Sequence, residues 1–297
     1  MPELPEVETI TRGLRQLIIG RTIKNVVCRD SPKSFPNAPT DVAQQVVGAA
    51  VVAVRRRAKV LLIDLSTNYT LVIHLKMTGQ LVYIKQKLKP EARFGGGHPT
   101  DSLIGTLPDK STRVVIAFQD ESHLYFNDQR KFGWIKLYPT AQVSQLEFMQ
   151  KLGPEPLTPQ LTATDFITRI RRRNNSSVKA AILDQTVLAG VGNIYADESL
   201  WAARIHPAQK VCSVSDETLA LLLHEIKSVM QLSITKGGST DKNYVNAEGK
   251  KGSYIDFARV FRKEGHPCVR HPDVLVQKTR VAGRGTHICP VCQPMAT

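Results

Sequence analysis

The sequence predicts an α+β protein with more than one domain: an antiparallel β-sandwich that carries an N-terminal helix, then a helical part and a Cys- and His-rich tail. Three observations predict this fold class. Short apolar runs separated by turns fill residues 1–138. Beyond residue 153 the apolar residues recur at helical spacing. Three of the five cysteines lie between Cys268 and Cys292.

The first part begins with one amphipathic helix from Pro5 to Leu17, which Gly20 ends. Its apolar positions recur at steps of three and four residues: Val7, Ile10, Leu14 and Leu17. Alternating or continuous apolar runs predict strands at 22–28, 51–54, 60–65, 70–75, 79–84, 113–118, 123–127 and 133–138. The segment 85–112 has no such period and is rich in Gly, Pro and Lys, so we expect a long mobile loop there.

The second part reads as helical after the turn-forming stretch "GPEPL" (153–157). Helices are predicted at about 164–172, 177–184, 194–203 and 215–235. The stretch "LAGVGN" (188–193) forms a Gly-rich turn between two of them. A basic loop follows "KGGST" (236–240) and leads into the tail.

Charge and composition favour a polyanionic partner. The 297 residues carry a formal net charge of +14 and give a pI of about 9.7, and the basic residues are clustered. Neutralising phosphates with such clusters releases condensed counterions, so nucleic acid is the expected partner. The sequence shows neither a transmembrane run nor a secretory signal, which predicts a cytoplasmic protein. The crowded, odd-numbered cysteines suggest metal binding rather than disulfides, and Cys28 and Cys212 are expected to be core thiols.

The opening "MPELPEVETI" suggests a nucleophile at the chain terminus. Removal of Met1 would leave Pro2 with a secondary amine, which attacks an aldehyde-like carbon to give an iminium ion. The positive end of the following helix would lower the pKa of that amine. Glu3 and Glu6 complement the same dipole, and one of them could move protons beside the nucleophile. Proline and glutamate are also favoured in any first helical turn, so these residues alone leave a purely structural role open.

The whole chain resembles the formamidopyrimidine-DNA glycosylase family in a series of ordered motifs. After the opening these are "RRRAKVLLIDL" (55–65), "HLKMTGQL" (74–81), "NDQRKFGW" (127–134), "LGPEPL" (152–157), "AGVGNIYADESLWAARIHP" (189–207), "GGSTDKNYVNAEGKKG" (237–252) and "VFRKEGHPC" (260–268). The resemblance implies a β-sandwich, a helix–two-turn–helix domain and a C-terminal β-hairpin zinc finger. The corresponding division is 1–138 for the catalytic domain, 139–153 for a linker, 154–236 for the DNA-binding helices, 237–259 for a lesion-capping loop and connector, and 260–297 for the finger.

The resemblance also implies a reaction: excision of oxidised purines from duplex DNA, then strand cleavage by β- and δ-elimination. Pro2 would attack the anomeric sugar carbon, and Glu3 would protonate the ring oxygen. Glu6 matches a residue that supports this terminus, and Lys59 matches a lysine close to the lesion and its phosphate.

The DNA contacts follow from the same resemblance. A flipped base leaves a hole, and three residues match those that fill it: Met77, Arg130 and Phe132. Phosphates would be held by His74, Lys59, Lys179, Asn193 and Arg284. The segment from Ser239 through Lys242, Asn243 and Tyr244 matches a loop that closes over the flipped purine.

The tail departs from the family pattern of two C-x-x-C pairs. Cys268 and His271 stand at the first pair, and Cys289 and Cys292 form the second. Histidine is a good zinc ligand, so we expect one structural Zn²⁺ in a Cys₃His site. His266 and His287 remain possible substitutes, and a finger that folds without zinc remains the alternative.

Two other functions remain open. An endonuclease VIII-like enzyme would act on oxidised pyrimidines, although Leu4 and the 239–245 segment favour purines by the same resemblance. A zinc-finger protein could instead bind damage without cutting, which the presence of Pro2, Glu3 and Lys59 disfavours. We expect a monomer whose partner is damaged double-stranded DNA, with no obligate protein partner and no membrane.

Overall fold

A computed structural model of the chain describes residues 1–29, 31–85, 93–98, 100–239 and 254–295. The chain folds into two units, Met1–Gln150 with Lys236–Ser253, and Lys151–Thr235 with Tyr254–Thr297. In the parts of the chain just given, no helix is long and apolar enough to cross a membrane.

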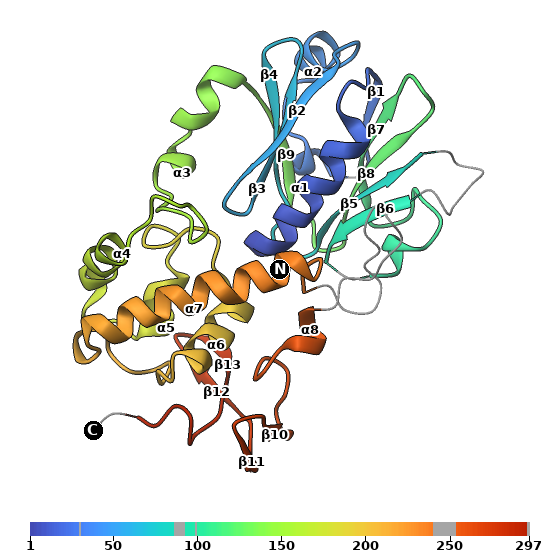
Figure 1. Cartoon of the computed structure of the whole chain (residues 1–297). Coiled ribbons are helices and arrows are strands. Elements are labelled where there is room, and N and C mark those ends of the chain that lie inside the picture. Colours follow the sequence, from blue (N-terminus) through green and yellow to red (C-terminus); the bar gives the residue numbers. More distant parts are fainter. Residues whose placement is uncertain (30, 86–92, 99, 240–253, 296–297) are drawn as a thin grey trace. The chain divides into compact units, whose positions relative to one another are not determined.

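The first unit contains two antiparallel sheets and the helix α1 (Leu4–Ile18) (Figure 1). One sheet has the order β2 (Val51–Arg57), β3 (Val60–Leu65), β4 (Tyr69–His74) and β9 (Trp134–Pro139). The other has the order β1 (Ile23–Cys28), β7 (Thr112–Phe118), β8 (His123–Asp128), β5 (Gly79–Ile84) and β6 (Arg93–Gly97). Short helices α2 (Pro39–Gln45) and α3 (Glu147–Gln150) lie between strands or after them.

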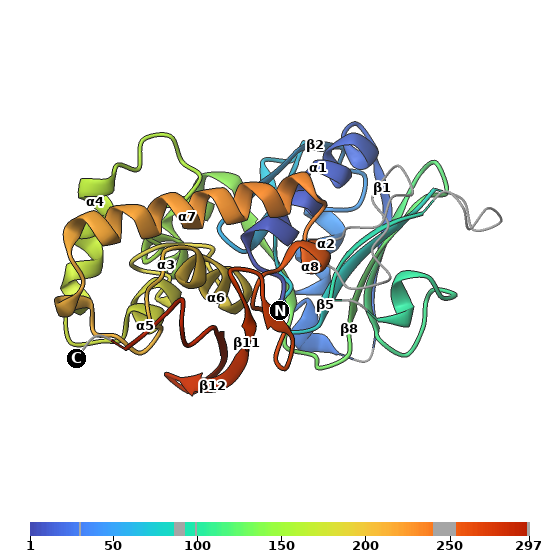
Figure 2. The same ribbon diagram turned by 60° about the horizontal axis from the view of Figure 1, so that its bottom comes forward.

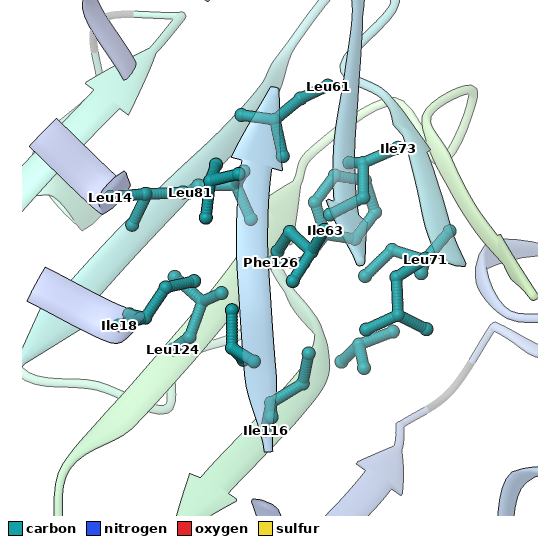
Figure 3. Packing of buried hydrophobic residues seen from close by; sticks show 14 of the residues in the cluster. Leu14, Ile18, Leu61, Ile63, Leu71, Ile73, Leu81, Ile116, Leu124 and Phe126 are labelled. Atoms are coloured by element: carbon teal, nitrogen blue, oxygen red, sulfur yellow. The ribbon is translucent and has the colours of Figure 1, made fainter. Parts of the chain in front are cut away.

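The core of this unit lies between the two sheets and includes one face of α1 (Figure 3). The first sheet contributes Leu61, Ile63, Leu71 and Ile73, the second contributes Leu81, Ile116, Leu124 and Phe126, and the helix contributes Leu14 and Ile18. All of these side chains are buried. Two packed sheets around one apolar layer confirm the predicted β-sandwich.

Glu8 and Arg15 fasten α1 to the neighbouring strand β2. Arg56 Nε donates to Glu8 Oε2 at 2.9 Å, and Arg12 Nε donates to Glu8 Oε1 at 2.7 Å. Burial opposes ionisation of Glu8, but the hydrogen bonds and charges of Arg56 and Arg12 hold its pKa below the usual value. Arg15 also donates to the Val54 carbonyl at 3.0 and 3.1 Å. The helix that follows the N-terminus is therefore fastened to the sheet.

The expectation of a loop throughout 85–112 is wrong for the residues that the structure describes. Arg93–Gly97 form β6, which pairs with β5, and Asp101–Leu103 form a 3₁₀ helix. The strand was missed because its sequence, "RFGGG", has low β-propensity. The glycines are needed for close approach: at Gly97, with φ of +124°, an added Cβ would lie 2.4 Å from the Gly79 carbonyl oxygen.

The second unit is helical and ends in two small hairpins (Figure 2). Its helices are α4 (Ala163–Ile170), α5 (Val178–Leu183), α6 (Asn193–Ala202), α7 (Asp216–Thr235) and α8 (Tyr254–Phe257). Its strands are β10 (Pro267–Cys268), β11 (His271–Leu275), β12 (Gln277–Val281) and β13 (Arg284–Ile288), paired as β10–β11 and β12–β13. The helix α7 packs on α4 and α6 through a buried stripe that includes Leu222, Ile226 and Met230.

The structure corrects the expectation for two cysteines. Cys28 and Cys212 are both exposed rather than in the core. Cys28 lies at the end of β1, and Cys212 lies in a short 3₁₀ helix between α6 and α7.

Candidate functional site

The chain terminus lies at the start of α1 and is held there by a glutamate. Pro2 is buried, and Glu3 and Glu6 are only 2 % and 5 % exposed. The Glu6 carboxylate accepts the Glu3 backbone N–H at 2.8 Å, and Glu3 is the N-cap of the helix. The residue that follows Pro2 is therefore fixed by the helix cap, which orients the terminus over the positive end of the helix.

Glu6 also reaches the first residues of the predicted capping loop. Its second carboxylate oxygen accepts the Ser239 backbone N–H at 2.9 Å. Gly238 packs on Glu6, since a Cβ added there would lie 3.5 Å from Glu6 Cγ. Lys242, Asn243 and Tyr244 lie outside the described residues, so their predicted roles stay predictions.

The structure brings Lys59 and His74 together at one end of the first sheet. Lys59 lies in the β2–β3 turn, is 7 % exposed, and precedes Val60, which pairs with His74 on β4. Burial, together with the charges of Lys76 and Lys59, lowers the pKa of His74 to about 3. The Lys76 backbone N–H donates to His74 Nδ1 at 3.0 Å, so the neutral ring carries its proton on Nε2. His74 is thus a neutral hydrogen-bond donor, not a cation.

The three residues predicted to fill a base-sized hole lie on two turns of this unit. Met77, in the β4–β5 turn, is 39 % exposed, and Phe132, in the β8–β9 turn, is 53 % exposed. Arg130 is exposed on the second turn, and its guanidinium lies 4.8 Å from the centre of the Phe132 ring. Large apolar side chains that remain exposed in this way are available to enter a partner.

In the second unit the Gly-rich turn between α5 and α6 is closed by Gln185. Gln185 Nε2 donates to the Leu183 and Val191 carbonyls, each at 2.9 Å, and its Oε1 accepts the Gly190 N–H at 2.9 Å. This residue was missed, because a lone glutamine has no sequence signal for turn closure. The turn delivers Asn193 to the first position of α6.

The tip of the β12–β13 hairpin contacts Asn193. Asn193 Nδ2 donates to the Gly285 carbonyl at 3.0 Å. Arg284 precedes Gly285 at the hairpin tip and is exposed. The hairpin tip that carries Arg284 is therefore bound to the first residue of α6, and a helix N-terminus is a favourable place for an anion.

Lys179, in contrast, is buried and does not reach the surface. Its side chain is 0 % exposed and pairs with the equally buried Asp197 at 2.5 Å. The ammonium group also donates to Thr286 Oγ1 at 2.7 Å and to the Gly285 carbonyl at 3.2 Å. In this structure Lys179 therefore holds the hairpin, and its predicted phosphate contact stays a prediction.

Asp197 and Glu198 are further positioning residues that the sequence reading missed. Asp197 Oδ2 accepts the His287 backbone N–H at 3.0 Å and contacts His287 Nδ1 at 3.1 Å. Glu198 accepts the backbone N–H groups of 259–261 at 2.7 to 2.9 Å, although burial raises the pKa of this carboxyl. These two adjacent acidic residues of α6 thus fasten the tail. The sequence feature that could have identified them is an acidic pair in a basic protein.

Cys268, His271, Cys289 and Cys292 form a metal site between the two hairpins, with ligand atoms within 4.8 Å of one another. The sulfur atoms of Cys268 and Cys292 are 3.7 Å apart, and His271 Nδ1 lies 3.2 Å from Cys292 Sγ. Tetrahedral zinc at about 2.3 Å from each thiolate separates two of them by about 3.8 Å. The donor set therefore fits one structural Zn²⁺.

The structure also decides between the histidines considered for this site. His287 is buried and is used by Asp197, with Glu264 Oε2 at 3.2 Å from its Nε2. His266 is exposed, and its Nδ1 lies 3.2 Å from the Glu264 carbonyl. Of these three histidines, His271 is the one whose ring lies with the three cysteine sulfurs, so it is the one placed to bind the metal.

The surroundings of Cys268 favour a thiolate. Burial opposes ionisation, but the backbone N–H groups of Arg270 and His271, with the Cys289 and Trp201 side chains, lower the pKa of Cys268 to about 6. The Arg270 guanidinium stacks 3.9 Å from the centre of the Trp201 ring. Hydrogen bonds from surrounding groups to ligand sulfurs are typical of zinc sites.

Comparisons with known proteins agree across the chain. The formamidopyrimidine-DNA glycosylase N-terminal domain matches residues 1–135, and the formamidopyrimidine-DNA glycosylase H2TH domain matches residues 152–244. The formamidopyrimidine-DNA glycosylase of Listeria innocua is 38% identical over 293 residues, covering 99% of this chain and 100% of that protein. The enzyme of Pediococcus pentosaceus is 39% identical and covers 99% of both chains.

Solved structures show the same fold. A mutant of the Lactococcus lactis enzyme in complex with Fapy-dG-containing DNA superposes with a TM-score of 0.85 at 31% identity, covering 99% of this chain and 100% of that one. The enzyme of Thermus thermophilus gives a TM-score of 0.82 at 33% identity and covers 100% of both chains. This chain belongs to the formamidopyrimidine-DNA glycosylase family.

Proposed function

We propose that this chain is a base-excision DNA repair enzyme that removes oxidised purines, 8-oxoguanine and formamidopyrimidines, from duplex DNA. It then cleaves the strand at the abasic site that remains. The observation that carries the proposal is the chain terminus: Pro2 is buried at the positive end of α1, next to Glu3, whose backbone is fixed by Glu6. Because its substrate is genomic DNA, we place its action at the nucleoid in the cytoplasm.

The reaction begins once Met1 has been removed. The Pro2 nitrogen attacks C1′ of the damaged nucleotide, the C1′–N bond to the base breaks, and the base leaves with the proton that the attacking amine gives up. Glu3 protonates the sugar ring oxygen, which opens the ring and gives the iminium ion. Glu6 orients this arrangement because its carboxylate holds the N–H of Glu3 at 2.8 Å.

Strand cleavage follows from the same iminium ion. Its positive nitrogen makes the C2′ proton acidic, so a base removes this proton and the 3′ phosphate leaves with the C–O electron pair. A second elimination releases the 5′ phosphate, and hydrolysis of the imine frees Pro2. Lys59 supplies positive charge near the departing phosphate, and its charge is felt by the neighbouring His74.

DNA binding is divided between the two units. In the first, His74 offers a neutral Nε2–H to a phosphate, and Met77, Arg130 and Phe132 occupy the place of the flipped nucleotide. In the second, Asn193 and Arg284 hold phosphates beside the start of α6. Zinc, when bound, would neutralise the negative charge of the thiolates and cross-link the tail. The hairpin that carries Arg284 would then be held through the four ligands Cys268, His271, Cys289 and Cys292.

Borohydride trapping tests the proposal. The protein is incubated with a duplex that contains 8-oxoguanine opposite cytosine, reduced with borohydride, and digested for mass spectrometry. The adduct is expected on the Pro2 nitrogen, with Met1 absent. Glu3→Gln should still bind the duplex but release little base.

The outcome also distinguishes the competing functions. A preference for thymine glycol over 8-oxoguanine would make the protein an endonuclease VIII-like enzyme. Absence of any covalent adduct would leave a protein that binds damage without cutting.

A further inference from the structure

Asp128 occupies an unusual place between the two turns that carry Met77, Arg130 and Phe132. It is the last residue of β8 and is 0 % exposed. Its carboxylate accepts from both turns: Thr78 Oγ1 donates to Oδ1 from the β4–β5 turn, and the Gly133 N–H donates to Oδ2 at 2.6 Å from the β8–β9 turn.

A third contact joins the turns to each other as well as to the carboxylate. The Arg130 N–H lies 3.2 Å from Asp128 Oδ1 and 3.1 Å from Thr78 Oγ1. The residues that follow the two exposed apolar side chains are therefore tied to one group: Thr78 follows Met77, and Gly133 follows Phe132.

Asp128 itself is anchored in the sheet. Its N–H donates to the Ser111 carbonyl at 2.8 Å, and its carbonyl accepts Arg113 Nε at 2.8 Å. It also pairs with Gly79, the first residue of β5. The carboxylate is thus a rigid reference point from which both turns are placed.

The turn after β8 is built closely around this carboxylate. Lys131 has φ of +58°, a conformation that needs support in a residue other than glycine. A Cβ added to Gly133 would lie 3.1 Å from Asp128 Oδ2 and 2.8 Å from the Phe126 ring. Without the carboxylate, the turn would lose the acceptor for two of its N–H groups.

We propose that Asp128 is a positioning residue for base flipping: it holds Met77, Arg130 and Phe132 in one arrangement before DNA arrives. The inference rests on the proposed function, in which these three side chains fill the vacated space. Holding them in advance lowers the conformational entropy that is lost when they enter the duplex. Asp128 is buried and its oxygens are occupied, so it acts through the turns and not on the substrate.

Asp128→Asn is the first test, because the amide keeps the shape but replaces one acceptor with a donor. Single-turnover base excision is measured on a duplex with 8-oxoguanine opposite cytosine. β-Elimination is measured on a single-stranded abasic oligonucleotide, in which no base is orphaned and no hole has to be filled. We expect duplex excision to fall at least about tenfold and single-strand cleavage to stay within about twofold.

Asp64→Asn is the matched control. Asp64 is a buried aspartate of the other sheet that also accepts from a threonine hydroxyl, Thr70 Oγ1 at 2.7 Å, and from the Arg55 guanidinium, and both of these partners lie in its own sheet. It should leave the ratio of the two rates unchanged. Thr78→Val removes only the link between the turns and should lower the ratio in the same direction by a smaller factor, even if Asp128→Asn folds poorly.

The proposal would be overturned if Asp128→Asn and Thr78→Val both kept the wild-type ratio of duplex excision to single-strand cleavage, whether the two rates fell in parallel or did not change. A second readout compares 8-oxoguanine opposite cytosine with 8-oxoguanine opposite an abasic analogue. The preference for cytosine should weaken in Asp128→Asn, because Arg130 is no longer held toward the orphaned base. If the wild-type protein fails to cleave the single-stranded abasic substrate, the proposed function fails, independently of Asp128.

Discussion

Replacing Lys179 with methionine separates a phosphate contact from a structural ion pair. Methionine keeps most of the length of the side chain and its apolar stem but removes the ammonium group. In the folded chain that group pairs with Asp197 at 2.5 Å and donates to Thr286 Oγ1 and the Gly285 carbonyl. The change leaves a buried carboxylate without its cation.

The expected loss of stability is large for a single substitution. Both side chains are 0 % exposed, so water does not compensate the remaining charge. Breaking a buried pair on one side costs about 3–5 kcal/mol. For a unit of this size each kcal/mol lowers the melting temperature by about 3 °C, so the second unit should melt about 10 °C earlier.

The assay combines thermal unfolding with DNA affinity over a range of salt concentrations. A side chain that neutralises one phosphate contributes about 0.9 to the slope of log affinity against log salt. We expect Lys179→Met to lower the melting temperature and to leave this slope unchanged. Arg284→Met, at the exposed hairpin tip, is the control and should show the reverse pattern.

A Lys179→Met protein with an unchanged melting temperature and a salt slope reduced by about one would refute this reasoning. Lys179 would then contact phosphate directly, as the sequence alone suggested.

Three further predictions concern single groups. The pKa of His74 is about 3 in the folded chain, below its unfolded value, so the stability that it contributes is present above about pH 6.5 and is lost toward pH 3. The free energy of unfolding should therefore fall as the pH falls in this range by up to about 1.4 kcal/mol per pH unit, and denaturation of His74→Asn should lack this slope. A variant with the same pH dependence as the wild type would contradict the prediction. Stripping zinc with a chelator should weaken duplex binding, and full affinity without metal would exclude a role for the finger in binding DNA. By metal analysis, His271→Cys should retain one zinc, whereas His271→Ala should not. Glu6→Ala removes the acceptor of two backbone N–H groups and should slow borohydride trapping at least about tenfold, with duplex affinity nearly unchanged; equal trapping would show that the terminus needs no such support.

Local sequence patterns were sufficient to predict most elements of this fold. The strand at 60–65 is a continuous apolar run between turns, and the structure has β3 at Val60–Leu65. The spacing of its apolar residues and the glycine at its end predicted the N-terminal helix, which the structure has as α1 at Leu4–Ile18. The metal ligands could be proposed from type and spacing, because zinc accepts few kinds of side chain. The roles proposed for Pro2, Glu3 and Lys59 came from the resemblance that the ordered motifs carry.

Features that depend on distant partners were decided only by the tertiary structure. β6 exists because glycines let its backbone approach β5, although the same glycines lower its own propensity. Lys179 is buried because Asp197 and the hairpin of residues 277–288 come together around it. Asp128 shows its importance only when two turns far apart in the chain meet at its carboxylate. A sequence reports the periods and chemical types of its residues, but whether a charge is exposed or paired depends on which segments the folded chain brings together.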